Sequence, residues 1–160
     1  VAAVNGVAAG AGASMALACD MVVACQAASF MLPFAKIGLI PDTACSWLVP
    51  QRLGQARALG LAMTGNKLPA AKAAEWGLIW DAVAEDVFAD AVQQLAEQLA
   101  TMPTKALVRT RQAMQAGRSN TLEQQLTLEG LYMRELGRSS DYVEGVSAFL
   151  EKRPPRFTGA

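Results

Sequence analysis

Two features in the first third of the chain could together remove a proton next to a carbonyl group. The first is a glycine-bearing turn over residues 6–12, which follows a short apolar run. A helix expected over residues 13–18 would begin there, and the first N–H groups of a helix can hold an anion or a developing oxyanion. Glycines also let another molecule approach the backbone closely. The second feature is Asp42, a carboxylate in a segment with almost no other charge. A donor site and an isolated base are what enolate chemistry requires.

The glycine turn has two other interpretations. The spacing of Gly6, Gly10 and Gly12 also resembles the phosphate-binding turn of short-chain dehydrogenases, which bind a nicotinamide cofactor. Such an enzyme would carry a Tyr-x-x-x-Lys motif, and neither Tyr132 nor Tyr142 has a lysine four residues later. Alternatively, the glycines only allow a helix to pack tightly against a strand.

The composition is that of a globular protein with no excess of either charge. Apolar residues make up 52% of the 160 residues, and 14 basic residues balance 14 acidic ones. A net charge of zero gives no reason to expect binding to nucleic acid or to an anionic membrane. The sequence has no apolar stretch long enough to cross a bilayer and no signal-peptide pattern, so we expect a cytoplasmic protein.

The side chains available for catalysis are limited. The chain contains no histidine, which excludes a Ser-His-Asp or Cys-His nucleophile and a histidine-ligated metal within it. The three cysteines are odd in number and lack C-x-x-C spacing, so neither a disulfide framework nor a zinc site is expected. Acid–base chemistry therefore falls to carboxylates, lysines, tyrosines or water.

Charge is distributed unevenly along the chain. Before residue 51 the only acidic and basic side chains are Asp20, Lys36 and Asp42. Such a segment resembles the interior of a protein and would normally lie between layers of further chain. Because the sequence also starts at Val1, within a predicted strand, we expect it to be the later part of a longer protein.

Hydrophobic periodicity and turn residues predict a series of short strands and helices, followed by longer amphipathic helices. Strands are expected over residues 1–4, 21–24, 29–32 and 78–83, and short helices over 13–18, 34–37, 43–53, 55–63 and 69–76. Asp42 is expected to be the N-cap of the third of these helices. From residue 86 onward, helices broken near Pro103 and residues 117–120 lead to a final helix over 140–152. Their apolar stripes are expected to form core or subunit contacts.

Several ordered motifs in this chain resemble the crotonase superfamily, also called the enoyl-CoA hydratase/isomerase family. They are AAVNGVAAGAG at residues 2–12, ACDM at 18–21, Phe30, Pro33, GLIPD at 38–42, TG at 64–65, AA at 73–74, WGLI at 76–79 and EGVSAFLEKR at 144–153. The resemblance implies an α/β fold with a partial core of repeated ββα turns in a spiral and a C-terminal helical region. It places the later part of the crotonase core, with the oxyanion turn and the catalytic aspartate, at residues 1–84. Residues 85–160 would be a helical region for trimerisation and for covering coenzyme A.

The resemblance also assigns roles to individual residues. Ala11 would supply one backbone N–H of the oxyanion hole at the thioester oxygen. Hydratases of the family carry two glutamates that handle water, and the matching positions here are Ser14 and Phe34. Adding water across a double bond needs both an acid and a base, so a simple hydratase is not favoured. Asp42 matches the position at which isomerase-type and dehalogenase-type relatives carry an aspartate, and it is expected to be the general base.

Further residues are expected to contact the substrate. Gly10, Phe34 and Trp47 lie near the proposed catalytic groups in sequence, and Phe34, Ile40 and Trp47 predict apolar surroundings for Asp42. Phe149 and Lys152 match tail positions that in relatives touch the adenine end of coenzyme A bound to a neighbouring subunit. They could equally be a hydrophobic contact and a solvated lysine. Lys36, the only cation near the site, is a weaker candidate for a phosphate contact.

Within the family, the combination of lost glutamates and retained aspartate resembles the isomerases of phenylacetate catabolism. It implies conversion of ring-1,2-epoxyphenylacetyl-CoA to the oxepin-CoA, or movement of a double bond in an enoyl-CoA. No separate cofactor is expected, because coenzyme A is part of the substrate, and a homotrimer or dimer of trimers is implied. The alternatives are a hydratase, a dehalogenase-like enzyme, against which the missing histidine counts, and a non-catalytic assembly subunit or fragment.

Overall fold

The computed structural model describes all residues from 1 to 160 and divides them into two compact units. The first unit spans Val1–Gln94 and the second spans Leu95–Ala160. The helix α5 (Phe88–Ala100) runs across the boundary. The sequence predicted a division between residues 84 and 85, with catalysis before it and trimerisation and coenzyme A covering after it. These roles stay a prediction.

Two small sheets form the first unit. In one, β1 (Ala2–Val4) pairs in parallel with β3 (Val22–Cys25), and β3 pairs in parallel with β6 (Asp81–Val83). In the other, β2 (Val7–Ala9) pairs in parallel with β4 (Ser29–Met31), and β4 pairs antiparallel with the two residues of β5 (Leu68–Pro69). The register places Ala2 opposite Val22 in the first sheet and Val7 opposite Ser29 in the second.

The strand β2 corrects the prediction made for the glycine turn. The sequence predicted a single strand, a tight turn and a helix, whereas the chain changes sheets at Asn5 and Gly6 and forms a second strand before α1 (Ala11–Ala18). A three-residue strand is too short to show an alternating pattern, so the run of alanine and valine gave no signal. The same order of two strands and a helix follows in β3, β4 and α2 (Cys45–Leu53), with a 3₁₀ turn η1 (Pro33–Ile37) between them.

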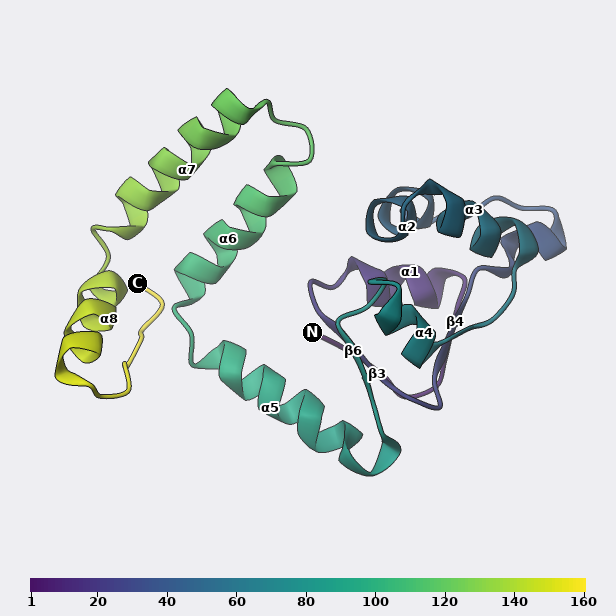
Figure 1. The fold of residues 1–160 in the computed structure, drawn as a ribbon, viewed down its shortest axis with the longest axis horizontal. Coiled ribbons are helices and arrows are strands. Elements are labelled where there is room, and N and C mark those ends of the chain that lie inside the picture. Colours follow the sequence, from purple (N-terminus) through teal and green to yellow (C-terminus); the bar gives the residue numbers. More distant parts are fainter. The chain divides into compact units, whose positions relative to one another are not determined.

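The helices of the first unit pack around one buried core. The helices α2 and α3 (Gln55–Thr64) lie side by side, and α2 also contacts α1 (Figure 1). The short helix α4 (Ala70–Glu75) lies near β6 and carries the buried Ala70 and Ala73. Large core side chains come from every layer of this unit and include Leu17, Val22, Phe30, Leu32, Val49, Leu61, Leu68 and Leu78. The last predicted strand, over 78–83, is shorter in the structure and begins at Asp81.

The second unit consists of helices. Helices α6 (Thr104–Ala116) and α7 (Leu122–Leu136) form an antiparallel pair, and α8 (Ser140–Glu151) follows (Figure 1). The predicted breaks near Pro103 and residues 117–120 are confirmed. The capping box of Thr121 and Gln124 fixes the start of α7, and Ser139 caps α8 by accepting a hydrogen bond from the Tyr142 N–H at 3.1 Å.

The apolar stripes of these helices do not form a buried core. No residue of α5, α6 or α7 is buried, and Leu122, Leu126 and Met133 on α7 are largely exposed. Phe88, at the start of α5, packs against the core of the first unit, as the core interpretation expected. That interpretation is wrong for the exposed residues of α7, for which subunit contact stays a prediction. No helix has the length and apolar character needed to cross a membrane.

Candidate active site

The predicted donor site lies at the N-terminus of α1, and its role stays a prediction. The helix begins at Ala11, two residues earlier than predicted, so Ala11 lies in its first turn. N–H groups in the first turn have no partner within the helix, and no side chain caps this end. The preceding Gly10 donates its own N–H to the Met31 carbonyl at 2.9 Å. The Gly10 N–H is therefore already paired, which agrees with the prediction that Ala11, and not Gly10, supplies the donor.

Gly10 is favoured at the turn by its backbone conformation. Its φ of 53° lies in the left-handed region, which residues with a Cβ rarely adopt. A Cβ at this position would stand 3.7 Å from the tip of the Phe34 ring. Phe34 is buried, with 9% of its surface exposed, and it therefore packs directly against the turn that precedes Ala11.

A chain of contacts brings Asp42 to the same place. The Ser14 hydroxyl, 1% exposed, donates to the Gly10 carbonyl at 3.4 Å and is also hydrogen bonded to the Cys45 thiol. Burial raises the pKa of Cys45, the hydrogen bond with Ser14 opposes this rise, and the negative charge of Asp42 adds to it. Cys45 thus contacts α1 on one side and lies close enough to Asp42 for their charges to interact. Sequence reasoning missed this link, because it assigned Ser14 only to the position of a hydratase glutamate and gave Cys45 no role.

Asp42 is not the N-cap that the sequence predicted. The helix α2 begins three residues later, at Cys45, and no side chain caps it. The Cys45 N–H donates to the backbone carbonyl of Asp42 at 2.8 Å, while the Asp42 carboxylate accepts a hydrogen bond from the Thr43 hydroxyl at 3.2 Å. The prediction failed because the chain makes a tight turn between Asp42 and the helix.

That turn is strained. Thr43 and Ala44 follow one another with φ of 47° and 63°, and neither is a glycine. Left-handed backbone costs a residue with a Cβ on the order of 1–2 kcal/mol. Strain of this kind is concentrated at functional sites, where it holds a group in place. Here it directly follows the carboxylate and fixes the direction in which the chain leaves Asp42.

The surroundings of Asp42 differ from those expected. Asp42 is exposed, and Ile40 and Trp47 are 81% and 53% exposed, so these two side chains do not bury the carboxylate. Of the three apolar neighbours expected from the sequence, only Phe34 is buried. Ile37 and Leu39 are also exposed, so several apolar side chains of the 37–47 segment are accessible, as Asp42 is.

The other candidate residues lie elsewhere. The aliphatic stem of Lys36 runs over Gly65, with Cε 2.9 Å from where a Cβ of that glycine would stand. Phe149 and Lys152 belong to the second unit, at the C-terminal end of α8. Phe149 is 82% exposed, and Lys152 follows the helix in a left-handed conformation with φ of 54°. Both are therefore accessible to a ligand.

Arg52 is a structural residue that sequence reasoning missed. From α2 it donates to the Leu17 and Cys19 carbonyls at 2.6 Å and 3.2 Å, at the C-terminal end of α1. It also donates to the Leu78 carbonyl at 3.0 Å. Its guanidinium thus joins three segments that are distant in sequence and stabilises the negative end of the α1 dipole. Backbone acceptors leave no trace in a sequence, so no pattern identified it.

We expect Arg52→Ala to destabilise the protein by about 3 kcal/mol, because it leaves three partly buried carbonyls without their charged donor. Urea unfolding followed by circular dichroism would measure the change. Arg52→Lys, which keeps the charge but loses the fork of donors, should lose less stability. A loss below about 0.5 kcal/mol in the alanine variant would show that water replaces these contacts at little cost.

The whole chain, residues 1–160, matches the sequence model of a family described as enoyl-CoA hydratase/isomerase. The chain belongs to this family. The expected resemblance is confirmed, and the matching segment includes the turn at Gly10, Asp42 and the C-terminal tail.

Individual relatives carry different names within the enoyl-CoA hydratase/isomerase family. The chain is 55% identical over 159 residues to 1,2-epoxyphenylacetyl-CoA isomerase of Escherichia coli, covering 99% of this chain and 61% of the relative. It is 50% identical over 159 residues to a probable enoyl-CoA hydratase of Rhodobacter capsulatus, covering 99% of this chain and 62% of that protein. The chain thus spans about three fifths of the length of these relatives.

Solved structures confirm the fold. An enoyl-CoA hydratase/isomerase from Mycobacterium abscessus, at 34% identity, superposes with a TM-score of 0.93 over 97% of this chain and 60% of its own. An enoyl-CoA hydratase subunit from Geobacillus kaustophilus, also at 34% identity, superposes with a TM-score of 0.92 over 98% of this chain and 61% of its own chain. The predicted α/β fold, with a crotonase-like ββα core and a C-terminal helical region, is therefore correct.

Proposed function

We propose that this protein is an acyl-CoA isomerase that works through an enolate of the thioester, with Asp42 as general base. The observation that carries the proposal is the chain of contacts from the Ala11 turn through Ser14 and Cys45 to Asp42. These contacts support the assignment of Asp42 and the N-terminus of α1 to one site, and the strained residues Thr43 and Ala44 fix the backbone beside Asp42.

The proposed mechanism divides the work between two groups. The N–H of Ala11 donates to the thioester oxygen, where negative charge develops as a proton leaves C2, and one such donor contributes about a hundred- to thousandfold in rate. Asp42 takes the C2 proton, which leaves an enolate, and then returns a proton to another carbon of the conjugated system. Every atom of the substrate is retained, so the net reaction is an isomerisation. Gly10, Phe34 and Trp47 would line the acyl group, and the exposure of the 37–47 segment is compatible with a bound apolar substrate.

The substrate we propose is ring-1,2-epoxyphenylacetyl-CoA. After C2 loses its proton, the ring C–C bond shared with the epoxide breaks and a ring carbon takes up a proton, which gives the isomeric seven-membered oxepin-CoA. Enoyl-CoA double-bond isomerisation would be a related activity in phenylacetate catabolism. Support comes from the name of the E. coli relative at 55% identity. Ser14 and Phe34 occupy the positions of the hydratase glutamates, and both lie against Gly10 in the structure. Because neither can activate water, the isomerase is favoured over the hydratase activity named for the R. capsulatus relative.

The remaining parts of the proposal concern binding and assembly. Phe149 and Lys152 would contact the adenine end of coenzyme A bound to a neighbouring subunit, and both are exposed at the end of α8. We also propose a homotrimer or a dimer of trimers. The exposed apolar side chains of the second unit support subunit contact there, and they include Leu122, Leu126, Leu131, Met133, Val143 and Leu150.

Deuterium exchange tests the proposed chemistry directly. The protein is incubated with phenylacetyl-CoA in heavy water, and deuterium at C2 is followed by mass spectrometry. Exchange well above the enzyme-free rate is expected, because enolate formation is the first step of the mechanism. A parallel assay with crotonyl-CoA follows the loss of the conjugated double bond. If water adds to crotonyl-CoA but phenylacetyl-CoA shows no C2 exchange, a hydratase replaces the isomerase proposal. If neither reaction occurs, an assembly role is favoured.

A further inference from the structure

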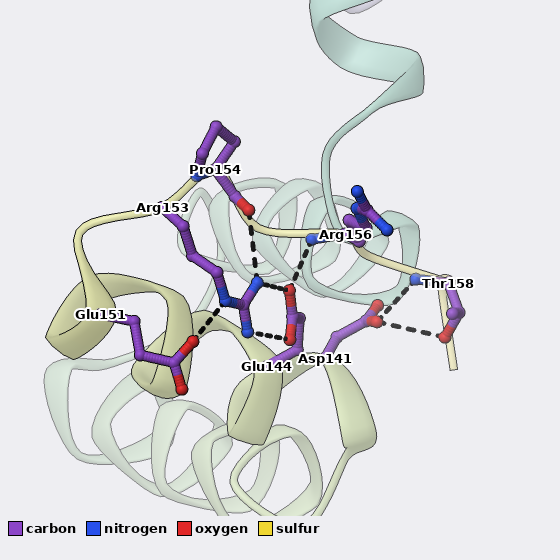
Figure 2. Close-up of polar contacts among 7 residues, drawn as sticks. All are labelled: Asp141, Glu144, Glu151, Arg153, Pro154, Arg156 and Thr158. Carbon is purple, nitrogen blue, oxygen red and sulfur yellow. Dashed lines mark hydrogen bonds and ion pairs between the residues drawn. The ribbon is translucent and has the colours of Figure 1, made fainter.

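The chain after α8 folds back along that helix. Residues 153–159 run from the C-terminal end of α8 towards its start, where Thr158 meets Asp141 (Figure 2). Two carboxylates hold this tail, Asp141 and Glu144, which are three residues apart and so lie on one face of the helix. The ring of Phe157 lies 3.5 Å from where a Cβ of Gly145 would stand, so the tail packs closely where the helix lacks a side chain.

Glu144 binds the first part of the tail. Its two carboxylate oxygens accept bidentate hydrogen bonds from the Arg153 guanidinium at 2.6 Å and 2.9 Å. One of them also accepts the Arg156 N–H at 2.7 Å. The bonds from Arg153, followed by that from Arg156, lower the pKa of Glu144 to about 2. Glu144 is therefore ionised at every pH at which the protein would be assayed, and this contact persists across that range.

Asp141 binds the second part of the tail. It is 5% exposed, and one of its oxygens accepts the Thr158 N–H at 2.7 Å and the Thr158 hydroxyl at 3.2 Å. Its other oxygen accepts the Gly159 N–H at 2.8 Å. The hydrogen bond from the Thr158 N–H is the main cause that lowers the pKa of Asp141, against the opposing effect of burial. Asp141 and Glu144 with the tail they hold are called here the tail clasp.

The tail clasp begins at the residue that follows Lys152. Lys152 ends α8 in the left-handed conformation, with φ of 54° and ψ of 41°. The Arg153 N–H donates to the Ala148 carbonyl at 3.0 Å and the Lys152 N–H to the Phe149 carbonyl at 3.3 Å. This helix ending is usually made by glycine, because a Cβ disfavours the conformation. A lysine persists in it only when the surrounding structure holds it there.

We propose that Glu144 and Asp141 are positioning residues that fix the backbone at Lys152, from which its ammonium reaches the phosphate end of the substrate. This inference rests on the proposed function, which assigns coenzyme A to the end of α8. The bidentate bond to Arg153 holds the chain immediately after Lys152, and the bonds to Thr158 and Gly159 anchor the far end of the tail. With both ends held, Lys152 keeps its left-handed backbone, and its side chain leaves the helix in one direction. Without the tail clasp, the backbone at Lys152 would spend part of its time outside the left-handed conformation.

The first test compares binding of coenzyme A itself, by isothermal titration calorimetry, in the parent protein and in Glu144→Gln. The amide of glutamine turns donors towards the Arg153 guanidinium, so the bidentate pair is lost. If the binding-competent conformation falls to between one half and one tenth of the molecules, the Kd rises about two- to tenfold. Glu129→Gln, which removes an exposed carboxylate of α7, is the matched control and should leave the Kd unchanged. The KM of the exchange reaction should rise in Glu144→Gln while kcat stays the same.

A double-mutant cycle separates positioning of Lys152 from a general structural effect. Glycine adopts the left-handed conformation without help, so Lys152→Gly removes both the ammonium and the need to hold it. Glu144→Gln should therefore raise the Kd in the parent background and leave it unchanged in the Lys152→Gly background. An equal rise in both backgrounds, or none in the parent, would overturn the positioning role while coenzyme A binding stands. A parent protein that does not bind coenzyme A would overturn the assignment of Lys152 and this inference with it.

Discussion

Asp42→Asn is expected to lower the rate of C2 deuterium exchange by about a hundred- to ten-thousandfold, the contribution of a positioned general base. Asparagine has nearly the same shape as aspartate but cannot accept the proton. It keeps the hydrogen bond from the Thr43 hydroxyl, and the carboxylate is exposed, so the fold should not suffer. Stability to urea should stay within about 0.5 kcal/mol of the parent, since surface substitutions rarely do more. Mass spectrometry of the thioester provides the measurement.

Asp20→Asn is the matched control for this prediction. Asp20 is the other acidic residue among the first 50 and lies in the bend between α1 and β3, away from the turn at Gly10. Its replacement removes the same charge and should leave exchange unchanged. Exchange that survives in Asp42→Asn at the parent rate would remove Asp42 from the mechanism. Equal losses in both variants would indicate a general effect of charge, and not a base at a defined position.

Local sequence patterns predicted most of the elements but not the turns that decide the site. The helices α3, α6 and α7 and the strands β3 and β4 follow from hydrophobic periodicity, proline, glycine and caps. These signals act over a few residues, and the structure confirms them. The same signals predicted Asp42 as an N-cap, and they failed because Thr43 and Ala44 adopt a conformation that neither residue type favours. Such strain is imposed by tertiary packing and cannot be seen in a local pattern.

The candidate site also combines features that residue type reveals with contacts that only the folded chain creates. The turn at Gly10 and the lone carboxylate of Asp42 stand out in the sequence, because glycine spacing and isolated charge are properties of residue type. The contact that relates them runs through Ser14 and the buried thiol of Cys45. These residues are ordinary by type, and they lie 31 positions apart. The tail clasp was missed for a similar reason: the acidic residues of α8 were visible, but three of the six hydrogen bonds that they accept come from backbone N–H groups of the tail.

Ala11→Pro should lower the exchange rate by about a hundred- to thousandfold, the usual effect of losing one oxyanion donor. Proline is the one natural residue without a backbone N–H, and it is well tolerated at the first position of a helix. Ala11 is the first residue of α1, so the substitution removes the proposed donor while the helix keeps its start. Circular dichroism and the urea midpoint should match those of the parent, and exchange with phenylacetyl-CoA gives the rate.

Gln55→Pro is a close structural control for Ala11→Pro. Gln55 is the first residue of α3, and, like Ala11, it follows a glycine in a left-handed conformation, Gly54 with φ of 73°. If proline harms the protein by disturbing a helix start, both variants should lose stability and activity together. If the N–H of Ala11 stabilises the enolate, only Ala11→Pro should lose exchange. Full exchange in a folded Ala11→Pro variant would rule out this donor and leave Asp42 to act without it.

Combining Ala11→Pro with Asp42→Asn tests whether the two groups act on the same step. The donor stabilises charge that exists only after the base has removed the proton, so the two contributions depend on each other. Once Asp42 is lost, removal of the donor should cost less than it does in the parent, as is usual for groups that act as a unit. Losses that multiply would indicate independent roles. Losses that do not multiply would indicate that both groups act on one step. The contacts from Gly10 through Ser14 to Cys45 would then belong to a single reaction centre.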